Sequence, residues 1–147
     1  MKKLIIGIGN KYRRDDYIGL IIAKKLHNLL NIDIVESNGD ILNIIDLLPK
    51  YDLVVFIDAI KSLDTPGKLH RYYLEDLNQE SERLTSTHSI NIVEVIELAK
   101  MFDTIPKIIF YGIEGKDFSI GEGLSDEVKR SIEENVNKIY EDLINIA

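Results

Sequence analysis

The chain has 147 residues, with 18 Lys and Arg against 25 Asp and Glu, so its formal net charge is −7 and its pI is near 5.0. Such an acidic chain repels phosphate groups, which argues against binding to nucleic acids or anionic membranes. The sequence contains no Cys, which excludes disulfides, thiolate metal sites and Cys nucleophiles. No apolar run approaches the ~18 residues of a membrane span. We therefore expect a soluble, cytoplasmic protein without membrane insertion.

The first half of the chain alternates continuously apolar runs with amphipathic segments. Short runs without polar alternation are typical of strands buried on both faces. We predict such strands at Leu4–Ile8 and Leu53–Ile57, and a second short strand between them at Ile32–Val35. Apolar residues at helical spacing predict a helix over Asp16–Leu30, and Ile41–Leu48 has the pattern of a short helix that ends at Pro49.

The second half continues the same alternation after a turn at Asp64-Thr65-Pro66-Gly67. Lys68–Leu74 alternates enough to be an edge strand, and Ser89–Met101 carries an apolar helical face. Lys107–Ile113 is the last buried strand in this interpretation. Ser125 then caps a long C-terminal helix that has acids in its first turn, where the helix dipole favours them.

These elements predict one α/β domain over residues 1–147, a three-layer α/β/α sandwich with a mostly parallel five-stranded sheet and one antiparallel edge strand. Right-handed crossovers put the first strand between the second and the third. Ligands of such sheets bind at the carboxyl ends of the strands, where the strand order reverses. Functional residues should therefore follow Ile8 and Ile57.

The segment after the first predicted strand contains two features of interest, the turn Gly7-Ile8-Gly9-Asn10 and the pair Asp15-Asp16. A dinucleotide-binding turn fails at Tyr12, where the third glycine should stand, and adjacent carboxylates would repel a pyrophosphate. Acids at a helix start usually cap free backbone N–H groups. One acid suffices for capping, which leaves the other to face the crevice.

Two further residues belong to the same predicted edge of the sheet. Asp58 stands in an apolar stretch, where a buried carboxylate is costly unless it is paired or bound to a cation, although bonds to loop amides are an equal alternative. His88 begins a predicted helix, whose N-terminus favours the neutral imidazole that binds metals. With Asp16 they would form an O/O/N ligand set suited to Zn, Ni, Mn or Fe. We assign no functional role to His27, which lies off the apolar face of the first helix, or to His70, which lies on the predicted edge strand.

Four motifs together resemble a known family: Gly7-x-Gly9-Asn10, Asp15-Asp16, Asp58-Ala59 and Thr87-His88. They are similar to those of the hydrogenase maturation proteases, and the resemblance extends over nearly the whole chain. These endopeptidases remove a C-terminal extension from the large-subunit precursor of nickel–iron hydrogenases. The resemblance implies that Asp16, Asp58 and His88 are both the metal ligands and the catalytic residues. It also implies that the nickel arrives with the precursor, after nickel insertion, and is used to recognise it.

The resemblance further implies a substrate-binding role for Asn10, Asn38 and Gly39, although Asn10 is equally well explained as a turn residue. The chain departs from many family members at Asp16, where they have Glu, and at Tyr17, where they have Gly. We expect another divalent metal to be able to replace nickel in the isolated protein. Both a metal-activated water and a carboxylate base are compatible with the implied hydrolysis.

Two other functions would use the same residues. One is a non-catalytic metal carrier, which would bind metal tightly and cleave no peptide. The other is a metal-free acid hydrolase in which one carboxylate of Asp15, Asp16 and Asp58 stays protonated beside its neighbours. The sequence has no large exposed apolar stripe, which favours a monomer that meets its partner transiently.

Overall fold

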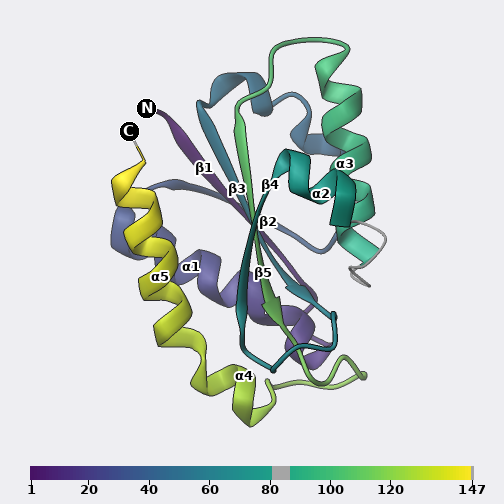
Figure 1. Cartoon of the computed structure of the whole chain (residues 1–147), viewed down its shortest axis with the longest axis vertical. Coiled ribbons are helices and arrows are strands. Elements are labelled where there is room, and N and C mark those ends of the chain that lie inside the picture. Colours follow the sequence, from purple (N-terminus) through teal and green to yellow (C-terminus); the bar gives the residue numbers. More distant parts are fainter. Residues whose placement is uncertain (81–86, 147) are drawn as a thin grey trace.

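The structure is a computed structural model that describes residues 1–80 and 87–146, with side chains described for 1–77 and 92–146 (Figure 1). The strands are β1 (Lys3–Ile8), β2 (Asp33–Ser37), β3 (Leu53–Ile60), β4 (Leu69–Tyr73) and β5 (Lys107–Glu114). They form a five-stranded sheet in the order β2-β1-β3-β5-β4, in which only β4 is antiparallel to its neighbour. The predicted fold class is confirmed, including β1 between β2 and β3 and the antiparallel edge strand.

Helices cover both faces of this sheet and give the molecule three layers (Figure 1). The α-helices are α1 (Ile18–Leu30), α2 (Leu74–Glu80), α3 (Thr87–Lys100), α4 (Asp126–Arg130) and α5 (Ile132–Asn145). Short 3-10 turns lie at Arg14–Tyr17, Leu42–Ile44 and Leu48–Lys50. α1 and α5 pack on one face, whereas α2, α3 and the 41–48 segment pack on the other.

Side chains of the central strands alternate between two hydrophobic cores, one on each face of the sheet. In β3, Phe56 and Ile60 belong to the core beneath α3, and Val55 and Ile57 belong to the core beneath α1 and α5. All eight residues of β3 are buried. Burial on both faces explains why the strand is continuously apolar in sequence.

Two predicted helices in the first half are wrong in form. The helix expected from Asp16 begins as the 3-10 turn Arg14–Tyr17, and α1 itself starts at Ile18. The segment Ile41–Leu48, expected as one helix, contains the 3-10 turn Leu42–Ile44, and a second 3-10 turn, Leu48–Lys50, begins at its last residue. Pro49 lies inside the second turn, where the first N–H groups of a helix have no internal acceptor and a missing donor is tolerated.

The long C-terminal helix predicted from Ser125 is interrupted at Ser131, between α4 and α5. The Ser131 hydroxyl donates a hydrogen bond to the Val128 carbonyl at 2.6 Å, a local bond that competes with a continuous helix. The turn at Gly67 packs onto this interruption, since a Cβ added to Gly67 would lie 2.7 Å from the Ser131 Cβ. Asn135 Nδ2 holds the turn by donating to the Gly67 carbonyl at 2.9 Å.

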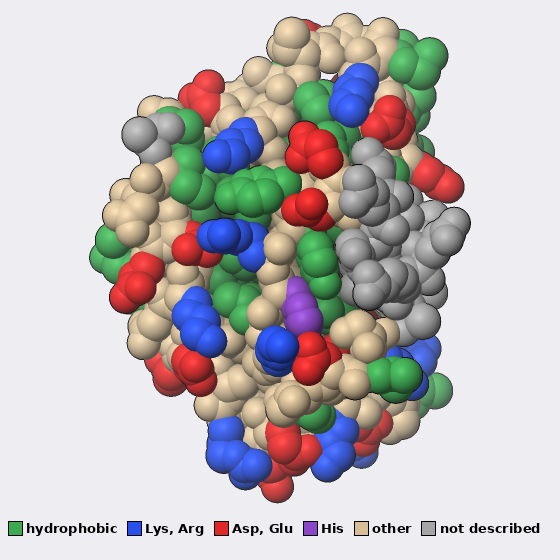
Figure 2. Space-filling model, in the orientation of Figure 1, with side chains coloured by type: hydrophobic (Ala, Val, Ile, Leu, Met, Phe, Trp, Pro, Cys, Tyr) green, Lys and Arg blue, Asp and Glu red, His purple; other side chains and the backbone are tan. Residues whose placement is uncertain are grey.

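Two other elements differ from the prediction: α2 was not expected, and β3 continues to Ile60, so that Asp58 lies inside the strand rather than after it. Within the part of the chain that the structure describes, no helix combines the length and the apolarity that crossing a membrane requires. On the face shown in Figure 2, acidic and basic side chains are interspersed among small groups of hydrophobic ones. The monomeric state and the cytoplasmic location stay predictions.

Candidate active site

The turn that carries Asp16 rests directly on the carboxyl ends of two neighbouring strands. A Cβ added to Gly19, in the first turn of α1, would overlap the carbonyl oxygens of Ile8 and Ile57. A Cβ added to Gly9 would in the same way overlap the Asp16 carbonyl oxygen. Only glycine permits both approaches, because the atoms that would be struck belong to the backbone and cannot rotate away.

Asp16 is half-buried and lies in the 3-10 turn, which also contacts β3. One of its carboxylate oxygens, Oδ2, accepts a hydrogen bond from the Asn10 backbone N–H at 3.0 Å. The Asn10 side chain accepts one from the Tyr12 N–H at 2.9 Å, which accounts for Asn10 as a turn residue. Its substrate-binding role stays a prediction.

Asp58 is fully buried in β3, directly after Ile57, whose carbonyl oxygen approaches Gly19. Because Phe56 and Ile60 face the core beneath α3, the alternation of the strand directs Asp58 to the same face. Its Oδ1 accepts a hydrogen bond from the Ala59 N–H at 2.8 Å. The fold thus brings Asp58 and the Asp16 turn to adjoining strands at the same edge of the sheet.

His88 lies in the first turn of α3, the helix that covers the face to which Asp58 is directed. Its side chain lies outside the described residues. Among the side chains that are described, no group of three His, Asp or Glu residues is arranged to hold a metal ion. The ligand set of Asp16, Asp58 and His88 therefore stays a prediction.

A groove of about 470 Å³ opens beside the Asp16 turn, lined by Gly9 and Leu20 on one side and by Ser37, Asn38 and Asp40 on the other. Asp40 and Gly39 also line a second hollow of about 450 Å³ that reaches Glu94 and Val95 of α3. Gly39 has a φ of +118°, a backbone conformation that favours glycine. Asn38 thus lines the groove together with Gly9, and Gly39 lines the second hollow, with Asp40 common to both.

The other two described histidines have structural surroundings. His27 donates its Nδ1–H to the Ile32 carbonyl at 2.6 Å and so ties the end of α1 to the following loop. His70 lies on the edge strand β4, with Nε2 3.3 Å from Asp64 Oδ2. The backbone N–H of Thr65 and, secondarily, the Lys68 ammonium group hold the pKa of Asp64 below its usual value.

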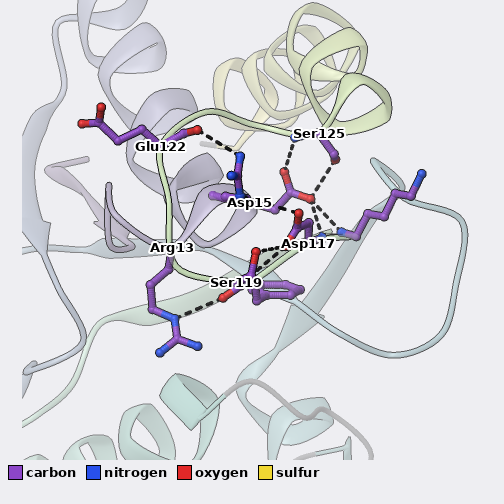
Figure 3. A network of polar contacts seen from close by, with 9 residues as sticks. Arg13, Asp15, Asp117, Ser119, Glu122 and Ser125 are labelled. Atoms are coloured by element: carbon purple, nitrogen blue, oxygen red, sulfur yellow. Dashed lines mark hydrogen bonds and ion pairs between the residues drawn. The ribbon is translucent and has the colours of Figure 1, made fainter.

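The expected helix cap is wrong, and Asp15 has a different role. Neither the 3-10 turn nor α1 has a side-chain cap. Asp15 is fully buried, and its carboxylate accepts hydrogen bonds from the backbone N–H groups of Lys116, Asp117 and Ser125, each at 2.8 Å. The Ser125 hydroxyl donates a further bond at 2.8 Å (Figure 3). Asp15 therefore connects the Asp16 turn to the loop between β5 and α4.

Sequence reasoning also missed Glu114, a fully buried acid at the end of β5. Its carboxylate accepts bonds from the Ser62 hydroxyl at 2.5 Å and from the Ser62 N–H at 3.0 Å. Glu114 thereby ties the loop after β3 to β5. The signal was available, since a lone acid closes an apolar run here as at Asp58.

A sequence model of the family described as hydrogenase maturation protease matches residues 20–142, most of the chain. The chain belongs to the hydrogenase maturation proteases. It is therefore a hydrolase of the peptidase class that processes a hydrogenase precursor. The matched range includes Asp58 and His88 and begins after Asp16. No curated protein matches the chain.

Solved structures agree with this family membership. The NiFe hydrogenase maturation protease HybD from Thermococcus kodakarensis is 28% identical, with a TM-score of 0.86 over 97% of this chain and 99% of that one. The protease HycI from the same organism is 26% identical, with a TM-score of 0.71 over 98% and 93%. The hydrogenase maturating endopeptidase HybD from E. coli, 21% identical, shares the fold with a TM-score of 0.84 over 97% and 92%.

Proposed function

We propose that this maturation protease removes the C-terminal extension of a nickel–iron hydrogenase large-subunit precursor after nickel insertion, and that it recognises the precursor through the bound nickel. The observation that carries the proposal is the close seating of α1 on β1 and β3. Gly9 and Gly19 permit this seating, and it brings the Asp16 turn onto the strand that contains Asp58.

The nickel is cargo of the substrate in this proposal, and the protease supplies additional ligands to it. Asp16 and Asp58 offer carboxylate oxygens at one edge of the sheet, and His88 begins the helix on the face to which Asp58 is directed. Carboxylate and imidazole donors suit nickel as well as zinc, manganese and iron. A precursor without nickel would lack the ion that completes this contact, so its cleavage would wait for metal insertion.

Hydrolysis would then depend on holding the scissile peptide bond beside the metal. Water adds across the C–N bond, its oxygen to the carbonyl carbon and a proton to the leaving amine. Positioning of the reacting groups contributes most of the acceleration in this scheme. The remaining contribution comes from the nickel, as it polarises the carbonyl or a water, or from a carboxylate acting as general base.

The extension itself would lie in the groove beside the Asp16 turn. The backbone of Asn38 and Gly39 and the polar side chains around it suit an extended peptide, whose amide groups need hydrogen-bond partners throughout. Asn10 directly follows Gly9, which lines this groove, and its N–H donates to the Asp16 carboxylate. The groove and the metal-binding residues would thus contact neighbouring parts of one substrate.

The test is to incubate the protein with nickel-loaded and nickel-free precursor and follow the mass of each by mass spectrometry. We expect loss of a C-terminal peptide from the loaded precursor alone. Asp16→Asn, Asp58→Asn and His88→Ala should each slow the reaction about 100-fold or more, since misplacement of reacting groups by ~1 Å costs about that much.

Matched controls are His70→Ala for the histidine and Asp46→Asn for the carboxylates, because Asp46 is exposed on the 42–50 segment. Both controls should cleave at the wild-type rate. Equal cleavage of loaded and nickel-free precursor would refute the nickel-dependent step. Tight metal binding by the isolated protein without any cleavage would instead favour the metal carrier.

A further inference from the structure

The turn that leads into Asp16 contains a backbone conformation that is unfavourable for its residue. Arg14 has a φ of +47°, in the left-handed region that side chains with a Cβ disfavour. Such residues persist only where the surroundings determine them. Arg14 directly precedes Asp15 and Asp16, so whatever holds this conformation also sets the direction of the Asp16 side chain.

Asp15 is the first of the groups that hold the turn. Figure 3 shows its carboxylate directed at the first residues of the loop after β5 and at Ser125, the residue that precedes α4. Ser125 occupies the N-cap position of α4, yet its hydroxyl makes no cap and donates to Asp15 Oδ2 instead. Serine at an N-cap position commonly accepts a hydrogen bond from a backbone N–H of its own helix. Because the Ser125 hydroxyl binds Asp15 instead, we infer that its role is to hold the Asp15 carboxylate.

The opposite side of the turn is held by the same loop. The Gly121 N–H donates to the Tyr12 carbonyl at 2.9 Å, and the Arg14 N–H donates to the Gly121 carbonyl at 3.2 Å. Arg14 Nη1 reaches the Glu122 carbonyl at 3.1 Å, and a Cβ added to Gly121 would lie 2.7 Å from the Arg14 guanidinium. The 12–15 turn and the 115–125 loop therefore form one connected unit.

Asp16 depends on this unit for its direction. In the described part of the chain its carboxylate accepts one hydrogen bond, from the Asn10 N–H, and its own N–H donates to the Arg13 carbonyl at 3.1 Å. Arg13 belongs to the turn that the 115–125 loop holds, and Asn10 is tied to this turn because its carbonyl accepts a hydrogen bond from the Arg13 N–H at 3.1 Å. A loosened turn would therefore move the Asp16 carboxylate relative to the ends of β1 and β3.

We propose that Asp15 and Ser125 are positioning residues of the protease, which hold the strained turn at Arg14 so that the Asp16 carboxylate stays over the strand ends. The consequence for cleavage rests on the proposed function. The placement of Asp16 itself does not, because it can be measured without a client.

The experiment compares two serine variants on the same loop. Ser125→Ala removes the hydroxyl that donates to Asp15, whereas Ser119→Ala removes one that donates to Asp117 Oδ1 at 2.6 Å. The Asp117 carboxylate contacts Arg14 through its other oxygen, Oδ2, which lies 3.7 Å from Arg14 Nε, whereas the Ser119 hydroxyl and N–H both donate to Oδ1. Ser119→Ala therefore leaves the ion pair with Arg14 and every bond to Asp15 in place. Ser125→Thr keeps a hydroxyl at the critical position and serves as the conservative variant.

The first measurement is hydrogen exchange at the Asn10 amide, the donor to Asp16. We expect Ser125→Ala to speed this exchange about tenfold relative to the wild type, equivalent to 1.4 kcal/mol. Ser119→Ala should leave the exchange unchanged, and Ser125→Thr should restore it. Equal exchange in Ser125→Ala and Ser119→Ala would overturn the proposal.

The second measurement is cleavage of nickel-loaded precursor well below the melting temperature of each variant. We expect kcat to fall about tenfold in Ser125→Ala with KM little changed, because docking is intact and only the alignment of Asp16 is lost. A kcat equal to that of Ser119→Ala would also overturn the positioning role. A wild type that cleaves no client while the exchange results hold would reject the proposed function alone.

Discussion

Asp15 and Asp16 are adjacent in sequence and have the same chemistry, but the fold treats them differently. Asp15 is fully buried, and its carboxylate accepts four hydrogen bonds from the loop before α4. Asp16 is half-buried, and within the described residues it accepts one, from Asn10. The satisfied carboxylate is therefore a structural anchor, and the less satisfied one retains lone pairs for a ligand.

The pair also explains why two adjacent acids stand at this turn although neither caps a helix. A carboxylate with free lone pairs at a strand end gains no stability from its position, and its direction is weakly determined. The neighbouring carboxylate provides the missing constraint because it is connected to a second loop. Stability and function are thus divided between consecutive residues.

The largest expected effect is a loss of stability that Asp15→Ala causes and Asp16→Ala does not. Asp15→Ala leaves three backbone N–H groups and a hydroxyl without their acceptor, and should lower the free energy of unfolding by about 3 kcal/mol. Asp16→Ala should change it by less than about 1 kcal/mol. Urea denaturation followed by circular dichroism measures both values.

If Asp15→Ala and Asp16→Ala lowered the free energy of unfolding by similar amounts, the distinction between the two acids would be wrong, because Asp16 would then stabilise the fold as well. Asp46→Ala provides the baseline for removal of an exposed acid. Its effect should lie within about 0.5 kcal/mol of zero.

Much of the sheet could be predicted from sequence. Leu53–Ile57 is a continuous apolar run, and Lys107–Ile113 is one after its first residue, a pattern that is typical of strands buried on both faces. Strand order then followed from the handedness of crossover connections. The interruption at Ser131 could not be predicted, because it depends on the Gly67 turn, which is distant in sequence and packs against it only in the folded chain.

The same limit applies to the site. Asp58 could be selected because it is a lone carboxylate in an apolar stretch, and Asp16 because it is the second acid of a pair that follows the glycine turn after the first strand. The role of Asp15 could not, since its partners Lys116, Asp117 and Ser125 are 101, 102 and 110 residues away. From local sequence, a helix cap was the reasonable prediction. In the structure the Asp15 carboxylate instead accepts hydrogen bonds from residues that are distant in sequence.

An intermediate effect on both stability and cleavage is expected from Gly19→Ala, at the point where α1 and the Asp16 turn pack on the strands. Gly19→Ala places a methyl group against the carbonyl oxygens of Ile8 and Ile57, so that α1 must shift. We expect a loss of about 2 kcal/mol in stability, within the range for overpacking, together with a fall of about tenfold or more in cleavage. Denaturation and the precursor assay measure the two effects.

Asn28→Ala is the control for Gly19→Ala, since Asn28 is exposed on α1 and touches no strand end. It should keep full activity, and better helix propensity should leave its stability unchanged or slightly higher. If Gly19→Ala cleaved as fast as the wild type, the close seating of α1 would not be what directs Asp16.

The smallest effect is expected from Ser62→Ala, which tests whether the Glu114 carboxylate anchors a loop, as Asp15 does, or acts on the substrate, as proposed for Asp16. Ser62→Ala removes the hydroxyl that donates to the buried Glu114 carboxylate, and should cost about 1 kcal/mol in unfolding free energy. Cleavage should stay within about twofold of the wild type, because Glu114 anchors a loop as Asp15 does without holding the Asp16 turn. Ser119→Ala, at an exposed carboxylate, should cost less than Ser62→Ala. A tenfold loss of cleavage in Ser62→Ala would instead place Glu114 beside Asp16 among the acids that act on the substrate, and the division between anchoring and ligand-facing carboxylates would have to be redrawn at β5.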